Sequence, residues 1–456
     1  MSQNRSFEYF GSKEERIRIN CINRTRQSTD FDNGELLCDE LVQDDSIIMN
    51  SIDLLNLLIQ SIVEDEIKES FDELVSIIQK YEYVAIHIAE VSSNQDFFLE
   101  IIASMKKNSL CCNLMIRLFA ELAYASSYFV TCLLNNGYLH NIIDFLLEIN
   151  PSIEIQGSFL FLFGTLYSDS PEAREEIKEY DAIQLIIAFK SCFKYLNTMK
   201  DAFFCCSLMI SSDFFDKKGI IDYVSVFEEI EPQMSFIFEN ITDESSYLEY
   251  LLKFLKFFCS NKLMVNVFTS NSNVLYLVNI KDRIPLVDFD YYLDIIISII
   301  TWSEKEIVEI IYKSFGMSFI IQFSPEARVN LLSTFFVYIS TLCSKLEFVV
   351  NDVFEQKIFI YFQSILNEQS GLYKMAFFNF LYSIFPFCSV DEVKSNMINP
   401  EIISLALEMW DFEGCIESES NKPYDLLKKI SRVLSITNSN EPLLSEWEQS
   451  FTNLLL

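Results

Sequence analysis

The segment LFGTLYSDSPEAREEIKEYDAIQLII, residues 162–187, decides the fold expected for this chain. After an apolar start, Ser170, Pro171 and Glu172 supply a capping hydroxyl, a proline in the first turn and an acid at the positive end of the helix dipole. Shifted back by 44 residues, the same order of apolar residues and polar breaks recurs from Leu118 to Ile143. The sequence therefore predicts a repeating unit built only of helices.

This unit recurs along most of the chain. An apolar marker residue stands at positions 122, 166, 208, 258, 300, 342 and 385, with steps of 44, 42, 50, 42, 42 and 43 residues. In most copies the next helix is expected 17 residues after the marker, as from Leu122 to Leu139 and from Ile300 to Met317.

A period of this length is typical of armadillo and HEAT units, which stack because one unit cannot cover its own apolar face. We predict an all-α, armadillo/HEAT-like, right-handed α-solenoid of about 7–9 degenerate repeats. The alternative is an irregular helical protein in which abundant Leu, Ile and Phe give chance matches.

Charge divides the chain into an arm and a body. The first 30 residues carry a balance of +2 and the other 426 carry −34, and residues 31–50 contain acids but no base. We therefore expect a flexible arm over residues 1–45, basic and then acidic, a solenoid over 46–436 and a capping helix over 437–456.

The composition excludes several kinds of chemistry. Two histidines cannot form a His-rich metal cluster, and nine glycines that lie at least seven residues apart exclude both GxGxxG and a P-loop. Twelve cysteines without a CxxC pair fit buried, reduced thiols of a cytoplasmic or nuclear protein. We expect no catalytic residue, metal or cofactor, with a helical enzyme as a minor alternative.

The charge and hydropathy also limit the partners. A net charge of −32 repels phosphate backbones, so nucleic acid is not an expected partner. No secretion signal and no apolar run long enough to span a bilayer occur, so we expect a soluble protein without membrane contact. We also expect the protein to be a monomer.

Residues 162–187 resemble an armadillo repeat, with Asp169, Arg174 and the run 181–183 at the places of that family's characteristic residues. The resemblance covers roughly residues 47–436 and is good for residues 118–189. Residues 16–26, RIRINCINRTR, resemble the middle of the importin-beta-binding arm of importin-alpha, the nuclear-import adapter. The resemblance implies a carrier-binding role for four arginines: Arg16, Arg18, Arg24 and Arg26. The alternative is a solvated basic tail.

Two features depart from importin-alpha. No base lies between Arg26 and Lys68, where that family's arm has a second basic cluster. The family's cargo groove repeats Trp and Asn four residues apart, and none of the equivalent pairs here has those residues: Arg117/Glu121, Phe161/Thr165, Lys253/Phe257 and Val337/Thr341. A basic cargo peptide would have to be held by carboxylates instead.

The last helix of each solenoid repeat lines the concave face, which makes its exposed residues the candidate groove. These are Arg117, Glu121, Tyr124, Phe161, Thr165 and Ser168, and further along the chain Lys253 and Tyr338. Ordinary surface or core positions are the alternative. The expected function is a non-enzymatic adapter, with the arm on an importin-beta-type carrier and a basic cargo peptide in an acidic groove. The alternative is an armadillo-type interaction scaffold unrelated to transport.

Overall fold

A computed structural model describes residues 45–389 apart from 93, 216–222, 243–244, 271, 324–328 and 356–370, together with 391, 393 and 428–429. The predictions for the four arginines of the arm and for the capping helix over 437–456 lie outside these residues. The chain divides into two units, Met1–Ser46 and Ile47–Leu456. The following description concerns the second unit.

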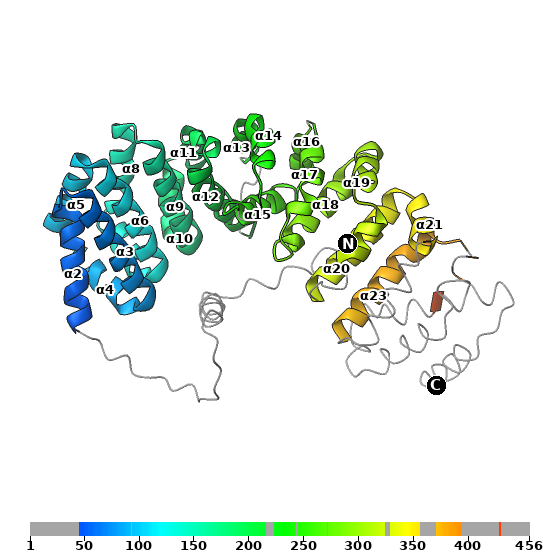
Figure 1. Ribbon diagram of the computed structural model, residues 1–456, viewed down its shortest axis with the longest axis horizontal. Helices are drawn as coiled ribbons and strands as arrows, with labels where there is room; N and C mark the ends of the chain where they lie inside the picture. Colours follow the sequence, from blue (N-terminus) through cyan, green and yellow to red (C-terminus); the bar gives the residue numbers. More distant parts are fainter. Residues whose placement is uncertain are drawn as a thin grey trace. The chain divides into compact units, whose positions relative to one another are not determined.

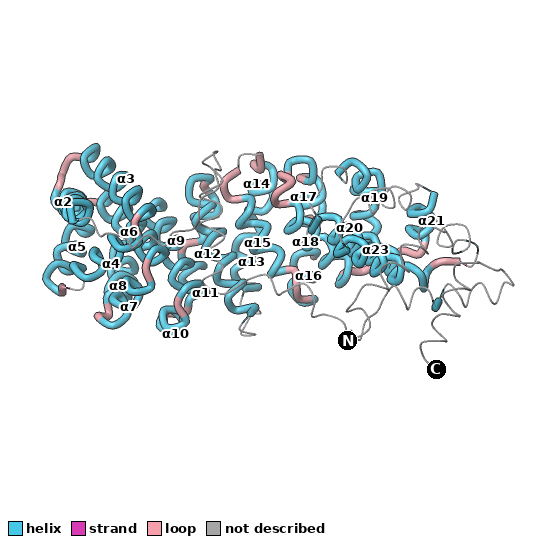
Figure 2. The backbone as a smooth tube through the Cα atoms, turned by 90° about the horizontal axis from the view of Figure 1, so that it is seen from below, coloured by secondary structure: helices cyan, strands magenta, loops and turns pink. Residues whose placement is uncertain are grey.

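Every element in the described residues is an α-helix or a short 3₁₀ helix, and none of these residues forms a strand (Figure 2). This all-helical stack is consistent with the predicted α-solenoid. The described helices are joined by short polar breaks such as the one at Asn150, which has a left-handed φ of 47°.

One long helix of each helical repeat belongs to a row, which we call the long-helix row. Each member contacts the next one in the row, and the helices follow one another in sequence order (Figure 1). The members are α3 (Glu64–Lys80), α6 (Ser109–Ala125), α9 (Ile153–Asp169), α12 (Leu196–Phe215), α15 (Leu248–Phe258), α18 (Phe289–Trp302), α20 (Val329–Lys345) and α23 (Gly371–Ile384).

Shorter helices connect successive members of the row and pack on one another as a second layer. Their described bounds are α4 (Glu82–Ser92), α5 (Gln95–Lys107), α7 (Ser127–Asn135), α8 (Tyr138–Ile149), α10 (Pro171–Glu179), α11 (Ala182–Ala188), α13 (Tyr223–Ile230), α14 (Met234–Glu239), α16 (Lys262–Thr269), α17 (Asn273–Asn279), α19 (Lys305–Phe323) and α21 (Phe348–Glu355), with α2 (Asp45–Gln60) before the row. Short 3₁₀ turns include η1 (Lys190–Lys194), η3 (Glu231–Gln233), η4 (Lys281–Arg283) and η5 (Phe385–Phe387). Gly316, at φ 56°, divides α19 into two helices, as the predicted helix start at Met317 requires.

The marker residues lie near the ends of the row helices. Leu122, Leu166, Ile300 and Leu342 are buried in the last turn of α6, α9, α18 and α20. Leu208 differs, because α12 continues for seven residues beyond it, to Phe215. This longer helix accounts for part of the single 50-residue step in the marker spacing, and the longer connection between Phe215 and Leu248 accounts for the rest.

The predicted helix start at Ser170 is confirmed. Its hydroxyl accepts a hydrogen bond from the backbone N–H of Ala173 at 3.1 Å, and Pro171 begins α10. Asp181 then caps α11 from a left-handed conformation with φ 54°, accepting from the N–H of Gln184 at 3.3 Å. Local sequence thus sets the ends of both helices.

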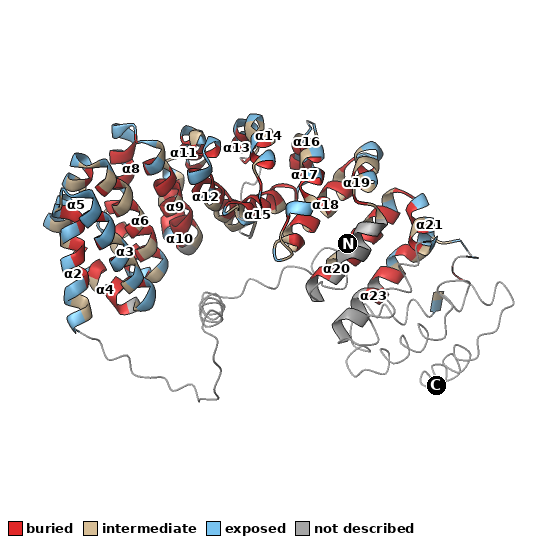
Figure 3. Cartoon of the chain, in the orientation of Figure 1, coloured by how far each residue is buried: buried red, intermediate tan, exposed pale blue. Residues whose placement is uncertain are grey.

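Buried residues run along the helices of both layers (Figure 3), and most of them are apolar. Helices α9 and α12 approach each other closely, since a Cβ atom on Gly164 would lie 2.7 Å from the Cα of Cys205. Of the nine free cysteines in the described part, seven are buried, as expected. Burial raises the pKa of Cys111 to about 11, so its thiolate is disfavoured and the thiol behaves as a core group.

A buried polar cluster joins the row to the second layer. The carboxylate of Asp213 on α12 accepts hydrogen bonds from the hydroxyls of Tyr167 at 2.7 Å and Tyr223 at 2.9 Å. Arg174, the arginine of the armadillo resemblance, donates from Nε to the carbonyl of Tyr167 at 3.0 Å. All these groups have protein partners, so the cluster acts in stability rather than in chemistry.

Candidate functional site: an aromatic stripe on the long-helix row

Five successive row helices each contribute one large side chain to a continuous stripe. The central stripe consists of Arg117 on α6, Phe161 on α9, Phe204 on α12, Tyr250 on α15 and Tyr291 on α18. These residues are 44, 43, 46 and 41 positions apart, which is the period of the repeat. All five side chains are half-buried, so each keeps one side on the row and one toward solvent.

The members of the central stripe touch through aromatic and cation–π contacts. The ring centroids of Phe161 and Phe204 lie 4.8 Å apart, and those of Phe204 and Tyr250 lie 5.2 Å apart with their planes at 84°. The Arg117 guanidinium lies 5.8 Å from the Phe161 centroid. These separations are typical of favourable ring and cation–π geometry.

Two lysines of α15 continue the stripe to α18. Lys253 Nζ lies 5.6 Å from the ring centroid of Tyr250 and 5.5 Å from that of Tyr291. Lys256 Nζ lies 5.3 Å from the same Tyr291 centroid. Tyr291 therefore has two ammonium groups near its ring.

Each cation of the stripe has a carboxylate partner. Arg117 forms an ion pair with Asp201 of α12, Lys253 pairs with Glu249 on its own helix, and Lys256 Nζ lies 2.6 Å from the Asp294 carboxylate of α18. Two of the three pairs bridge different helices. They tie the row together while leaving the aromatic rings partly exposed.

The Arg117–Asp201 pair crosses over α9, which lies between α6 and α12 in the row. This reach depends on small residues of α9: a Cβ atom on Gly157 would lie 3.3 Å from Asp201 Oδ2, and Ser158 donates to the Asn113 side chain of α6 at 2.5 Å. The Asp201 side chain is only 5% exposed. Burial raises the pKa of its carboxyl, and the Arg117 guanidinium opposes part of that rise.

Charged and aromatic neighbours set the pKa of Lys253. Burial lowers the pKa of Lys253, but Tyr291, Glu249 and Tyr250 outweigh it, so the pKa lies above its ordinary value and the lysine stays charged. Burial and the neighbouring Glu249 raise the pKa of Asp288, whereas Lys253 lowers it. Glu249 and Asp288 are therefore two carboxylates that act on the same ammonium group.

The groove residues expected from the sequence occupy three kinds of position. Arg117, Phe161 and Lys253 lie in or beside the central stripe. Glu121 is half-buried and accepts from the Gln79 amide of α3 at 3.2 Å, and Tyr124 is 52% exposed at the end of α6.

Two of the remaining three candidates lie deeper. Thr165 is 3% exposed and donates to the carbonyl of Phe161 at 2.9 Å, and Tyr338 is fully buried. Ser168 is half-buried in the last turn of α9. The central stripe thus runs through Phe161 rather than through Thr165 or Tyr338.

Sequence reasoning missed the aromatic residues Phe204, Tyr250 and Tyr291 and the charged residues of the site other than Arg117 and Lys253, among them Asp201 and Lys256. The three aromatic residues could have been found by stepping one repeat at a time from Phe161. Asp201 could not be found in this way, because its ion-pair partner Arg117 lies two row helices earlier, on α6.

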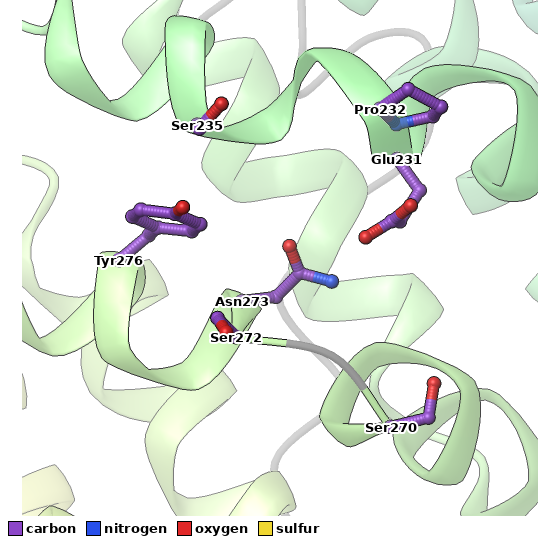
Figure 4. Close-up of a pocket in the computed structure, with 7 residues that line it drawn as sticks. All are labelled: Glu231, Pro232, Ser235, Ser270, Ser272, Asn273 and Tyr276. Carbon is purple, nitrogen blue, oxygen red and sulfur yellow. The ribbon is translucent and has the colours of Figure 1, made fainter.

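A hollow of about 450 Å³ opens beside η3 and α14, opposite the start of α17 (Figure 4). Its lining is mostly polar and has one charged group, Glu231; the other residues are Pro232, Ser235, Ser270, Ser272, Asn273 and Tyr276. Small-molecule sites are mostly apolar with a few polar groups, so this hollow is a poor candidate.

Neither a metal site nor a membrane-spanning helix occurs in the described part of the chain. No group of three or more His, Cys, Asp or Glu side chains there is arranged to hold a metal ion. None of the helices described combines the length and apolarity needed to cross a bilayer.

Comparison with known proteins indicates the fold but no family. No family model matches the chain, and no curated protein matches it. The solved structures that it resembles include the crystal structure of an engineered protein, with a TM-score of 0.55 over 86% of this chain and 100% of that chain. The two sequences are 11% identical, so the likeness concerns the arrangement of helices alone.

Proposed function

We propose that this chain is a non-enzymatic adapter with an armadillo-type superhelix, and that the central stripe binds an extended, basic segment of a partner protein. The observation that carries the proposal is the line of half-buried aromatic rings on α9, α12, α15 and α18, one per repeat. A surface with one binding position per repeat suits an extended peptide, because both have a regular spacing along one direction.

The charge of the stripe favours a basic partner. Four carboxylates, Asp201, Glu249, Asp288 and Asp294, accompany three cations, and the whole chain carries −32. Lysine and arginine stems stack on aromatic rings while their charged ends reach carboxylates. The negative field of the chain would also speed the capture of such a segment.

Binding of a lysine-rich peptide tests this function. We expect a short fluorescein-labelled lysine-rich peptide to bind, and to bind more weakly as salt rises, because the Debye length falls to about 10 Å at 0.1 M salt. The same peptide with glutamine in place of lysine should bind much more weakly. Absence of binding, or binding equal for both peptides, would contradict the proposal.

A pair of tyrosine variants locates the surface. Tyr250→Ala removes a ring from the middle of the stripe and should weaken peptide binding by about 3- to 10-fold, the value of one or two cation–π contacts. Tyr195→Ala is the matched control, since Tyr195 is 53% exposed and lies in the turn before α12, outside the stripe. Equal loss in both variants would place binding elsewhere.

Nuclear import is the narrower form of this proposal. It adds a carrier of the importin-beta type, bound by Arg16, Arg18, Arg24 and Arg26, to the basic cargo on the stripe. Deletion of residues 1–30 should then abolish carrier binding and leave peptide binding in place. If the full-length chain does not bind the carrier, the protein is an interaction scaffold unrelated to transport.

A further inference from the structure

Lys253 occupies the part of the central stripe that is best built for a cation. Its ammonium group has the rings of Tyr250 and Tyr291 at 5.6 and 5.5 Å, and it pairs with Glu249 one helical turn before it. Asp288, at the start of α18, adds a second carboxylate that senses the Lys253 charge. Two aromatic rings and the Glu249 carboxylate thus lie beside one positive charge, and Asp288 interacts with it electrostatically.

This arrangement has the chemistry of a binding position for a lysine or arginine side chain of another protein. Cations are held over aromatic rings by the ring quadrupole, and nearby carboxylates add charge and hydrogen-bond acceptors. Here the position is filled from within the chain, because Lys253 projects from the helix that also supplies Tyr250 and Glu249.

Lys253 and Lys256 differ in what holds them. Lys256 bridges α15 to Asp294 of α18 at 2.6 Å, so its removal would break a contact between two row helices. The Lys253 ion pair is with a residue of its own helix whose side chain is 47% exposed. Lys253 itself is 29% exposed, and a partly exposed pair within one helix is worth little, so displacing Lys253 breaks no ion pair between row helices, whereas displacing Lys256 does.

We infer that Lys253 is an internal occupant of the position that receives a basic side chain of the partner, and that partner binding displaces it. The inference rests on the proposed function and adds to it the regulation of one defined position. The consequence is competition: Lys253 lowers the affinity for every basic segment, and only segments that also contact the rest of the stripe overcome it.

The direct test is Lys253→Met, which keeps most of the stem and removes the charge. With the internal competitor gone, Glu249 and Asp288 are left for the peptide, and we expect the lysine-rich peptide to bind about tenfold more tightly, equivalent to about 1.4 kcal/mol. The glutamine peptide should not gain. Lys253→Gln should change binding in the same direction, and urea unfolding of both variants establishes that they are folded.

Lys313→Met is the matched control. Lys313 also lies four residues after its acidic neighbour, with Nζ 3.9 Å from Glu309, but it is on α19 and outside the row. It removes the same charge from the chain, so any gain from the change in net charge alone would appear in both variants. The expected result is a gain for Lys253→Met that Lys313→Met does not share.

The outcomes separate this inference from the function on which it rests. If the wild-type chain binds the lysine-rich peptide and Lys253→Met binds it equally or more weakly, Lys253 is a contact or a bystander and the inference is wrong. A gain that Lys313→Met shares also overturns it. If neither the wild type nor the variant binds, the proposed function fails, and the inference fails with it.

Discussion

Gly164 tests how closely α9 packs against α12. In Gly164→Ala the added Cβ would lie 2.7 Å from the Cα of Cys205, closer than real Cβ contacts. Alanine favours the helix by about 1 kcal/mol relative to glycine. Overpacking costs about 1–3 kcal/mol, and the upper end applies because the obstacle is backbone that cannot rotate away. We therefore expect a net loss of about 2 kcal/mol in the free energy of unfolding.

Urea unfolding followed by circular dichroism measures this loss. Gly157→Ala is the control on the same helix: its Cβ would lie 3.0 Å from a methyl carbon of Thr198 and 3.3 Å from Asp201 Oδ2, which are side-chain atoms and can shift. The helix-propensity gain of about 1 kcal/mol is the same, and these milder contacts cost about as much, so this variant should lie within about 0.5 kcal/mol of the wild type. If Gly164→Ala is as stable as the wild type or more stable, the close approach of α9 and α12 does not restrict the size of the side chain at residue 164.

Three further variants test the buried polar groups and one cap. The raised pKa of Asp201 means that the folded chain holds the proton of this carboxyl more tightly than the unfolded chain does. The resulting stabilisation is fully present below the unfolded pKa of about 4, and it is lost as the pH rises through the folded-state pKa. The unfolding free energy of the wild type should therefore fall relative to Asp201→Asn over that window; a difference that does not vary with pH would contradict the role of burial. Tyr223→Phe removes a donor from the buried Asp213 carboxylate and should cost about 1–3 kcal/mol in urea unfolding, so a neutral variant would show that this hydrogen bond is replaced. Ser170→Ala removes the cap of α10 and should cost about 1 kcal/mol by the same measurement, which a stability equal to that of the wild type would disprove.

The order of helices could be predicted from the sequence because it depends on local patterns. The markers at Leu122, Leu166 and Ile300 recur because one apolar position at the end of each row helix must be buried against its neighbours. The start of α10 could also be predicted, because a capping serine and the proline after it act on their own backbone. The 50-residue step was not explained from the sequence, since it combines the extension of α12 to Phe215 with a longer connection to α15.

The candidate site was only half predictable. Arg117 and Phe161 were found because they occupy the last helix of their repeats, where a solenoid lines its binding face. Thr165, four residues after Phe161, is instead buried against its own helix. Because the two residues are four positions apart, both lie near the same face of the helix. Only the packing of the neighbouring helices decides that Phe161 stays half-buried and Thr165 is buried.

The sequence by itself determined the all-helical class, the length of the repeat, the ends of several helices and the excess of negative charge. Each of these follows from the chemistry of neighbouring residues or from simple counts. Only the tertiary structure decided that Arg117 pairs with Asp201, that Phe161, Phe204 and Tyr250 touch, and that Lys253 lies between two tyrosines. The reason is that these contacts depend on how closely successive helices approach, which the side chains of three or four repeats set together.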